Sequence, residues 1–206
     1  MKKKNSNALL MVFMKNPIAG KVKTRLAAKV GNNEALNIYK RLIEHTHFVT
    51  SKTTIYDKAI YYSSSVDEHD QWDTDSYSKY LQKGNGLGEK LSNAFSDAFI
   101  NGYKKVIAIG TDSFEITSDI IDNAFRSLED SDIVIGPAKD GGYYLIGMNE
   151  HKAELFKDIE WGTDTVLSNT LSIIKDMACK HLLLKELSDI DTLEDYENHK
   201  ITQNVS

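Results

Sequence analysis

Basic, acidic and glycine residues gather in five short segments of this 206-residue chain, each placed after an apolar run. The segments are residues 15–25, 84–89, 110–113, 136–143 and 188–192. Lysine and arginine neutralise phosphates, carboxylates hold hard divalent cations, and glycine lets backbone N–H groups approach a ligand. In an open α/β sheet, ligands bind outside the carboxyl ends of the strands. The five segments therefore predict one phosphate-and-metal site, and with it an enzyme.

The first segment holds most of the local positive charge. Pro17 and Gly20 keep its backbone out of a helix until Thr24, where a helix is predicted to begin. N–H groups at a helix start, with cations beside them, favour an anion. A solvated basic loop is the alternative interpretation, and the Walker spacing is absent. The cations are Lys15, Lys21, Lys23 and Arg25.

The second segment places Gly84, Gly86 and Gly88 at the start of a predicted helix. Its spacing and position differ from the dinucleotide fingerprint, and no suitable acid follows about twenty residues later, so we exclude NAD. The glycines still allow close backbone approach to a ligand. Glu89 lies in the first turn, where it complements the helix dipole.

Carboxylates follow three of the predicted strands. Asp112 ends the strand of residues 104–109, and alone it would be interpreted as a helix cap. Asp140, Asp189 and Asp191 follow other strands, and hard divalent ions require several oxygen ligands. We therefore expect Mg²⁺ or Mn²⁺ here. Asp191 and the following Thr192 also suit a helix cap, and both roles can coexist.

The fourth segment adds backbone donors and aromatic rings. Gly141 and Gly142 let backbone N–H groups approach a ligand, and Tyr143 or Tyr144 can stack on a base or sugar, with one of the two expected to be buried. Trp161 precedes a helix and is a weak candidate for lining an acceptor pocket.

Bulk composition fits one cytoplasmic domain over residues 1–206. Hydrophobic residues make up 41% of the chain, and the single Cys179 excludes an internal disulfide framework. No Cys-rich or His-rich cluster indicates zinc, and His45 and His47 are interpreted as structural. The net charge of −5 argues against nucleic acid, and no run is long enough to span a membrane. The basic start before residues 8–14 imitates a signal peptide, but a buried first strand fits better.

The periodicity alternates strands and helices along the chain. We expect strands at residues 8–14, 58–63, 78–82, 104–109, 132–136, 143–147 and 181–187. We expect helices near residues 33–49 and 88–102. A third helix is expected to start at about residue 118 with Thr117 or Ser118 as its cap, and a fourth to cover residues 164–178 with Thr163 or Asp164 as its cap.

This order predicts an α/β fold of three layers, α/β/α, with a mostly parallel sheet that a hairpin at 132–147 makes mixed. Residues 64–77 read as a mobile surface loop, and the tail after about residue 199 as disordered.

Taken in order, the motifs resemble a bacterial family of GT-A-type transferases, the selenodomain-associated or arsenosugar-biosynthesis-type glycosyltransferases (DUF2064-like). The motifs are Lys-x-Pro-x-x-Gly-x-Val-Lys-Thr-Arg-Leu, Gly-x-Gly-Leu-Gly-Glu, Gly-Thr-Asp-Ser, Gly-Pro-Ala-x-Asp-Gly-Gly-Tyr-Tyr-Leu-Ile-Gly and Asp-x-Asp-Thr. The layout is also similar to phospholactate guanylyltransferases and, more distantly, to molybdopterin nucleotidyltransferases. The resemblance implies the nucleotide-diphospho-sugar transferase fold.

The resemblance also implies roles for single residues. Asp112 and Asp191, with Asp189, would hold the metal, and Lys15, Lys23 and Arg25 would face the phosphates. Phe114 stands where relatives usually carry proline, and Gly162 replaces a more usual polar residue. The resemblance thus leaves the geometry at the acceptor open.

Three functions follow, with the same residues in each. The first is metal-dependent glycosyl transfer from a nucleotide diphospho-sugar to a small molecule, with Asp112, Lys23 and Arg25 acting on the phosphates and Asp140 as a candidate base. The second is nucleotidyl transfer from an NTP to a small phosphorylated acid, which releases pyrophosphate. The third is a non-catalytic nucleotide-binding domain. The sequence does not identify the donor or the acceptor, and it leaves open whether the protein forms a homo-oligomer.

Overall fold

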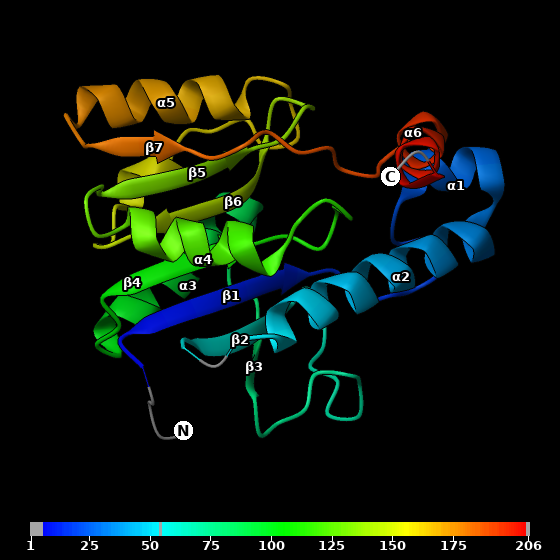
Figure 1. The fold of residues 1–206 in the computed structure, drawn as a ribbon, viewed down its shortest axis with the longest axis horizontal. Coiled ribbons are helices and arrows are strands. Elements are labelled where there is room, and N and C mark those ends of the chain that lie inside the picture. Colours follow the sequence, from blue (N-terminus) through cyan, green and yellow to red (C-terminus); the bar gives the residue numbers. More distant parts are fainter. Residues whose placement is uncertain (1–5, 54, 205–206) are drawn as a thin grey trace.

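The computed structural model describes residues 6–53 and 55–204, and strands and helices alternate along them (Figure 1). The strands are β1 (Ala8–Met14), β2 (Asp57–Tyr62), β3 (Tyr77–Leu81), β4 (Lys105–Ile109), β5 (Ile133–Pro137), β6 (Tyr143–Met148) and β7 (His181–Leu183). The helices are α1 (Thr24–Val30), α2 (Asn32–Ser51), α3 (Leu87–Ile100), α4 (Ser118–Ser127), α5 (Val166–Asp176) and α6 (Leu193–Asn204), with a 3₁₀ helix η1 (Ala153–Phe156).

The seven strands form one sheet in the order β3-β2-β1-β4-β6-β5-β7. Strand β6 runs antiparallel to both of its neighbours, and the other pairings are parallel. The expected hairpin is therefore confirmed, since β5 and β6 pair antiparallel around the turn at residues 138–142. The fold class is the predicted one: a mostly parallel, mixed sheet between two helical layers.

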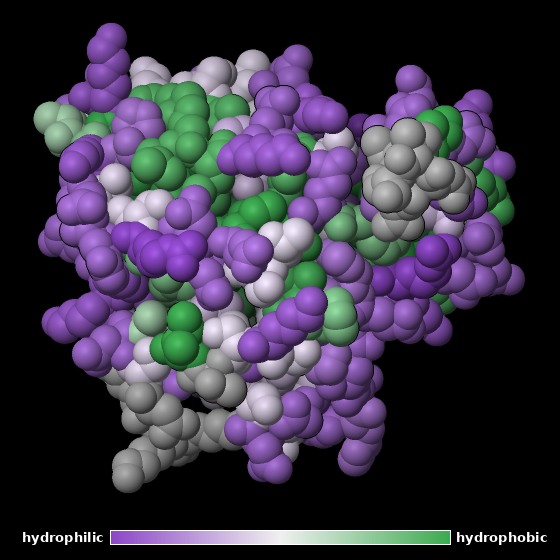
Figure 2. All heavy atoms as spheres, viewed as in Figure 1, coloured by the Kyte–Doolittle hydropathy of each residue, from purple (hydrophilic) through white to green (hydrophobic). Residues whose placement is uncertain are grey.

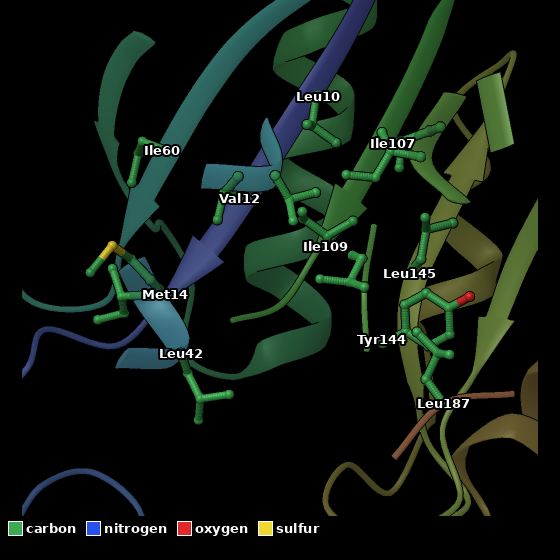
Figure 3. Close-up of a cluster of buried hydrophobic side chains, with 14 of the residues drawn as sticks. Leu10, Val12, Met14, Leu42, Ile60, Ile107, Ile109, Tyr144, Leu145 and Leu187 are labelled. Atoms are coloured by element: carbon green, nitrogen blue, oxygen red, sulfur yellow. The ribbon is translucent and has the colours of Figure 1, made fainter. Parts of the chain in front are cut away.

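Side chains on both faces of the sheet are buried, which explains the unbroken apolar runs of the central strands. On β1, Leu10, Val12 and Met14 face a cluster that includes residues of α1, α2, α4 and α6. The alternate residues of β1 face a second cluster built with α3, η1 and α5. Figure 3 shows part of the first cluster, with labelled side chains from β1, β2, β4 and β6 and Leu42 of α2.

The molecular surface is mostly hydrophilic on the face drawn in Figure 2, with an apolar area over β5 and β7. Leu182 and Leu183 of the edge strand β7 are among the exposed large apolar side chains. No helix among residues 6–53 and 55–204 has the length and apolar character needed to cross a membrane.

Three expectations differ from the structure at the ends of elements. Strand β7 ends at Leu183, because the chain leaves the sheet and rejoins it only through a bridge between Leu187 and Ala138. Helix α5 begins at Val166 with Thr165 in the N-cap position, so neither Thr163 nor Asp164 is the cap. Residues 200–204 belong to α6, whereas a disordered tail is predicted after about residue 199; residues 205–206 lie outside the described part.

The segment of residues 64–77 also differs from the mobile surface loop that its composition predicts. Trp72 is only 1% exposed and makes edge contacts with His47 and Tyr77. Asp70 accepts hydrogen bonds from the Tyr62 hydroxyl and the Lys79 ammonium. An aromatic side chain in a polar segment thus anchors the segment to α2 and β3.

Candidate functional site

The candidate site lies at the carboxyl ends of β1 and β4, neighbouring parallel strands from which the chain leaves in different directions. After β1 the chain builds α1, α2, β2 and β3 on one side, and β4 leads to β5 and β6 on the other. Ligands bind at such a switch point in open α/β sheets. Lys15 directly follows β1, and Asp112 lies just beyond β4, so the first and third motifs meet here.

A cavity of about 270 Å³ at this point is lined almost entirely by charged side chains. Its cationic lining consists of Lys15, Lys21, Lys23 and Arg25, and its carboxylates are Asp112, Asp140, Asp189 and Asp191. Val22, Thr24 and Tyr39 complete the lining. The structure therefore brings together the charged residues of four motifs that are separate in the sequence.

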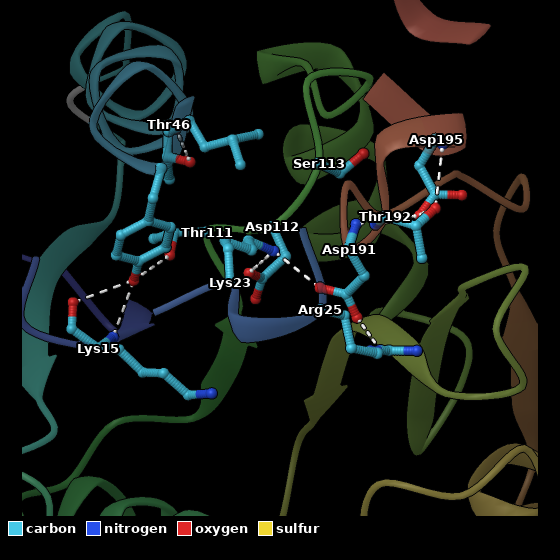
Figure 4. A network of polar contacts seen from close by, with 12 residues as sticks. Lys15, Lys23, Arg25, Thr46, Thr111, Asp112, Ser113, Asp191, Thr192 and Asp195 are labelled. Atoms are coloured by element: carbon cyan, nitrogen blue, oxygen red, sulfur yellow. Dashed lines mark hydrogen bonds and ion pairs between the residues drawn. The ribbon is translucent and has the colours of Figure 1, made fainter. Parts of the chain in front are cut away.

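Lys23 lies at the centre of this charge arrangement (Figure 4). It takes a left-handed backbone conformation with φ of 48° at the N-cap of α1, and its side chain is only 4% exposed. Its ammonium Nζ donates to Asp112 Oδ1 at 2.5 Å and to Asp191 Oδ1 at 3.0 Å. Burial alone would lower the pKa of Lys23, but the attraction of Asp112 and Asp191 outweighs it and holds the pKa above its usual value.

Asp191 is held by two cations. Its second oxygen, Oδ2, accepts from Arg25, whose side chain is 67% exposed. Burial alone would raise the pKa of Asp191, but Lys23 and Arg25 hold the pKa below its usual value. Asp191 is therefore an ionised carboxylate with both oxygens engaged.

Asp189 has the opposite electrostatic environment. Burial, followed by repulsion from Asp112 and Asp140, raises the pKa of Asp189 to about 8. Its Oδ1 is buried without a hydrogen-bond partner in the described structure. Such an oxygen is costly unless a proton or a cation satisfies it.

Hydrogen bonds to the backbone hold the two acidic segments together. Ile190 N–H donates to the carbonyl of Asp112 at 2.8 Å, and the Ser113 hydroxyl donates to the carbonyl of Ser188 at 2.6 Å. Beyond Asp191, the Thr192 hydroxyl accepts from Asp195 N–H, and the Asp195 carboxylate accepts from Thr192 N–H. This reciprocal cap confirms the capping role expected of Thr192 and places Asp191 just before the first turn of α6.

Tyr39 is a member of the site that sequence reasoning missed. Its hydroxyl accepts from Lys15 N–H at 2.9 Å, donates to Lys15 C=O at 3.0 Å and lies 3.1 Å from Thr111 Oγ1. It thereby links the segments that follow β1 and β4. Its apolar spacing on α2 resembles that of a core residue, so only the spatial neighbourhood reveals the role.

A second, larger cleft of about 540 Å³ adjoins the charged cavity and shares Lys15, Arg25, Tyr39 and all four of its carboxylates. The remaining lining is largely apolar and aromatic, and includes Phe13, Leu87, Leu91, Tyr143, Trp161 and Val166. Tyr144 is buried, which confirms that expectation for one of the two tyrosines, and Tyr143 packs edge-on against Trp161. Another cavity, of about 290 Å³ between α3 and the β2–β3 edge, contains none of the predicted site residues.

Four of the predicted glycines, Gly20, Gly86, Gly88 and Gly141, do not line either cavity. A Cβ on Gly88 would come within 2.6 Å of Trp161 Nε1, and one on Gly141 within 2.1 Å of the Asp164 carbonyl. Gly20 packs beside Asn32, and Gly86 has open space around it. Gly142 and Thr24 do line the cavities, and Gly142 N–H donates to Asp140 Oδ1 at 2.9 Å.

Phe114 lies away from the cavities and packs against the C-terminal helix. Its ring stacks on His199 of α6 with centroids 4.7 Å apart and meets His45 of α2 edge-on. Phe114 therefore packs α6 against α2, and it lines neither the charged cavity nor the adjoining cleft.

Solved structures with a similar fold include nucleotide-diphospho-sugar transferase-like proteins. A protein from Desulfovibrio desulfuricans G20, provisionally named a nucleotide-diphospho-sugar transferase, matches with a TM-score of 0.87 and 29% identity over 96% of this chain and 88% of that chain. The inositol-1-phosphate CTP transferase from T. maritima matches with a TM-score of 0.57 and 14% identity over 96% and 95% of the two chains. A manganese complex of Rv0371c from Mycobacterium tuberculosis H37Rv matches with a TM-score of 0.53 and 10% identity over 92% and 96%.

The last two likenesses concern the fold alone. No curated protein sequence matches the chain. A model of a family described as uncharacterised protein conserved in bacteria matches residues 48–163, a segment that contains Asp112 and Asp140. The chain therefore belongs to the DUF2064 family.

Proposed function

We propose that the chain is a transferase for a nucleotide-activated donor, and that it moves a glycosyl group from a nucleotide diphospho-sugar to a small-molecule acceptor. The observation that carries this proposal is the junction of two cavities. The charged one suits a diphosphate, and the adjoining aromatic cleft suits the base, the sugar or the acceptor. The likeness to the Desulfovibrio protein over nearly the whole chain supports it.

A divalent cation, Mg²⁺ or Mn²⁺, fits the chemistry of this cavity. Its carboxylates are hard oxygen donors, and the buried, unpartnered Oδ1 of Asp189 is suited to a cation. Asp112, Asp189 and Asp191 are the proposed ligands. Within residues 6–53 and 55–204, however, no three His, Cys, Asp or Glu side chains are gathered as a metal site. A bound cation would supply Lewis-acid stabilisation of the departing phosphates.

The side chains of the chain have separable tasks in this proposal. Arg25 is mostly exposed and Lys15 lines both cavities, so these cations bind and orient the phosphates. Asp140 also lines both cavities, and the Gly142 N–H fixes one of its oxygens. Asp140 is therefore the candidate that accepts a proton from an acceptor hydroxyl.

Nucleotidyl transfer is the second candidate function, because the same charged cavity suits the triphosphate of an NTP. The fold is shared with the inositol-1-phosphate CTP transferase, although that likeness is limited to the fold. In this reaction an acceptor phosphate or carboxylate attacks the α-phosphorus, and pyrophosphate leaves. The products distinguish the two reactions: a nucleoside diphosphate for glycosyl transfer and pyrophosphate for nucleotidyl transfer.

Thermal unfolding with a set of nucleotide sugars and NTPs tests the proposal, with Mg²⁺, Mn²⁺ or EDTA present. We expect a metal-dependent rise in Tm with one nucleotide sugar. Asp112→Asn should abolish the rise, whereas Asp119→Asn, an exposed acid in the first turn of α4, should keep it.

The ligand class that raises Tm decides between the functions. A rise only with an NTP, followed by pyrophosphate release, would replace glycosyl transfer by nucleotidyl transfer. Binding without any product would favour a non-catalytic nucleotide-binding domain. Absence of any rise with every ligand would contradict the proposed donor class.

A further inference from the structure

The ammonium of Lys23 occupies the space between the proposed metal ligands. It contacts one oxygen of Asp112 and one of Asp191, and its side chain is 4% exposed. A buried ammonium is costly unless carboxylates pair with it, and these carboxylates repel one another without a cation. Lys23 and the acidic cluster therefore stabilise each other in the absence of metal.

The same carboxylates have to be released before a divalent cation can use them. Such a cation needs several oxygen ligands at short distance, and a second positive charge in contact with them would repel it. Asp191 already accepts a hydrogen bond from Lys23 on Oδ1 and one from Arg25 on Oδ2. This explains why the acidic residues line one cavity although no three of them are gathered as a metal site in the described residues.

A lysine side chain has the rotatable bonds that an exchange of partners requires. Its flexible stem carries a compact charge with three donors, unlike the planar fork of arginine. Lys15, Lys21 and Arg25 line the same cavity, so its cationic side already suits a phosphate to which Lys23 could turn.

We propose that Lys23 is a resident counter-ion that stands in for the divalent cation, and that metal binding transfers its ammonium from Asp112 to the phosphates of the ligand. This inference rests on the metal site of the proposed function. The exchange predicts that the metal and the phosphate ligand bind with positive coupling. A bound metal frees the Lys23 ammonium for the phosphate, and a bound phosphate draws the same ammonium away from the metal ligands.

The test measures Mn²⁺ binding to the protein alone by electron paramagnetic resonance. Lys23→Met keeps an apolar stem and removes the competing charge, so we expect its affinity for Mn²⁺ to exceed that of the wild type about tenfold or more. Lys21→Met, which removes an exposed charge from the same cavity, is the matched control and should change the affinity by less than about threefold. Equal or weaker Mn²⁺ binding by folded Lys23→Met would overturn the inference.

Chemical acetylation with mass spectrometry provides a test that needs no substitution. In the wild type without metal, the exposed Lys21 should react and the buried Lys23 should be protected. Saturating Mn²⁺ should make Lys23 reactive, and continued protection would contradict the exchange. Absence of Mn²⁺ binding by the wild type and by Lys23→Met alike would instead overturn the metal site of the proposed function.

Discussion

The hydroxyl of Tyr39 makes contacts with both segments that carry the candidate site. It satisfies the backbone N–H and C=O of Lys15 and lies beside Thr111, the neighbour of Asp112. Burial raises the pKa of Tyr39, so the hydroxyl remains protonated and can donate throughout the physiological range. One side chain from α2 therefore sets the separation of the cationic and the acidic segments.

Replacing Tyr39 by phenylalanine should lower stability and ligand affinity together. The substitution leaves the backbone N–H of Lys15 without its acceptor, which costs about 1–3 kcal/mol in the free energy of unfolding. Urea unfolding measures this loss, and the metal-dependent rise in Tm with the bound nucleotide should shrink. Tyr80→Phe serves as a control, because Tyr80 is 43% exposed on the edge strand. An unchanged Tyr39→Phe protein would show that the bridge has no energetic role.

At the scale of elements, the turn between β5 and β6 is pressed against the start of α5. Gly141 has φ of +87°, and its carbonyl accepts a hydrogen bond from Leu167 N–H at 2.8 Å. The backbone of Asp164 occupies the space that a Cβ on Gly141 would need. Asp140 and Gly142 of this turn line the cleft together with Trp161.

Gly141→Ala and Gly162→Ala form a matched pair that separates strain from contact. Both glycines have positive φ, of +87° and +85°, so both substitutions should cost about 1–2 kcal/mol for the backbone conformation. Only at position 141 would the new Cβ meet a backbone carbonyl, at 2.1 Å. We therefore expect Gly141→Ala to be the more destabilising by about 2 kcal/mol or more in urea unfolding. Equal losses would contradict the close approach of the turn to α5.

The contact between α2 and the segment of residues 64–77 should respond to pH. Burial, opposed by Asp73, lowers the pKa of His47 from its ordinary value of 6.5, while its ring packs against Trp72. A lowered folded-state pKa gives stability that is present above pH 6.5 and is lost as the pH falls through the folded-state value. Urea unfolding between pH 5 and 8 should therefore show an acid-side loss that is smaller in His47→Gln. His69→Gln, at an exposed position, should keep the wild-type profile.

At the scale of the whole molecule, net charge and local charge have opposite signs. The chain carries −5 overall, yet four cations line one cavity. The long-range field therefore repels large polyanions, whereas a small phosphate that enters the cavity meets cations within a Debye length.

Salt should consequently weaken the binding of a small phosphate ligand without giving duplex DNA any affinity. We expect calorimetric titration with pyrophosphate to show an affinity that falls as NaCl rises from about 50 to about 500 mM. Arg25→Ala should reduce both the affinity and its dependence on salt, since Arg25 is exposed beside the cavity. Retention of duplex DNA at physiological salt would contradict this distribution of charge.

The sequence predicts the layers of the molecule better than the contacts between them. Apolar runs locate the central strands closely, and β1 has the predicted bounds of residues 8–14. The short β7 was predicted too long, because Leu184 and Leu187 still pack against the core after the chain has left the sheet. Burial alone does not distinguish a strand from a packed connection.

The charged part of the candidate site was foreseeable, and its internal pairing was not. Strand ends carry the lysines and carboxylates, and parallel strands place those ends at one edge. That Lys23 would be buried between Asp112 and Asp191 depends on three-dimensional distances, as does the bridge from Tyr39 to Thr111. Residue types at strand ends predict the charges of a site, whereas their partners follow only from packing.

The ion pair between Lys23 and Asp191 joins residues 168 positions apart. During synthesis the chain emerges from its N-terminus, at about 5–20 residues per second. Lys23 is therefore synthesised well before Asp191, and the ion pair between them can form only after Asp191 has been added to the chain. A product that stops before residue 188 has its lysines without two of the four carboxylates that offset them. The charge balance of this site is therefore completed only by residues that follow β7, the last strand of the sheet.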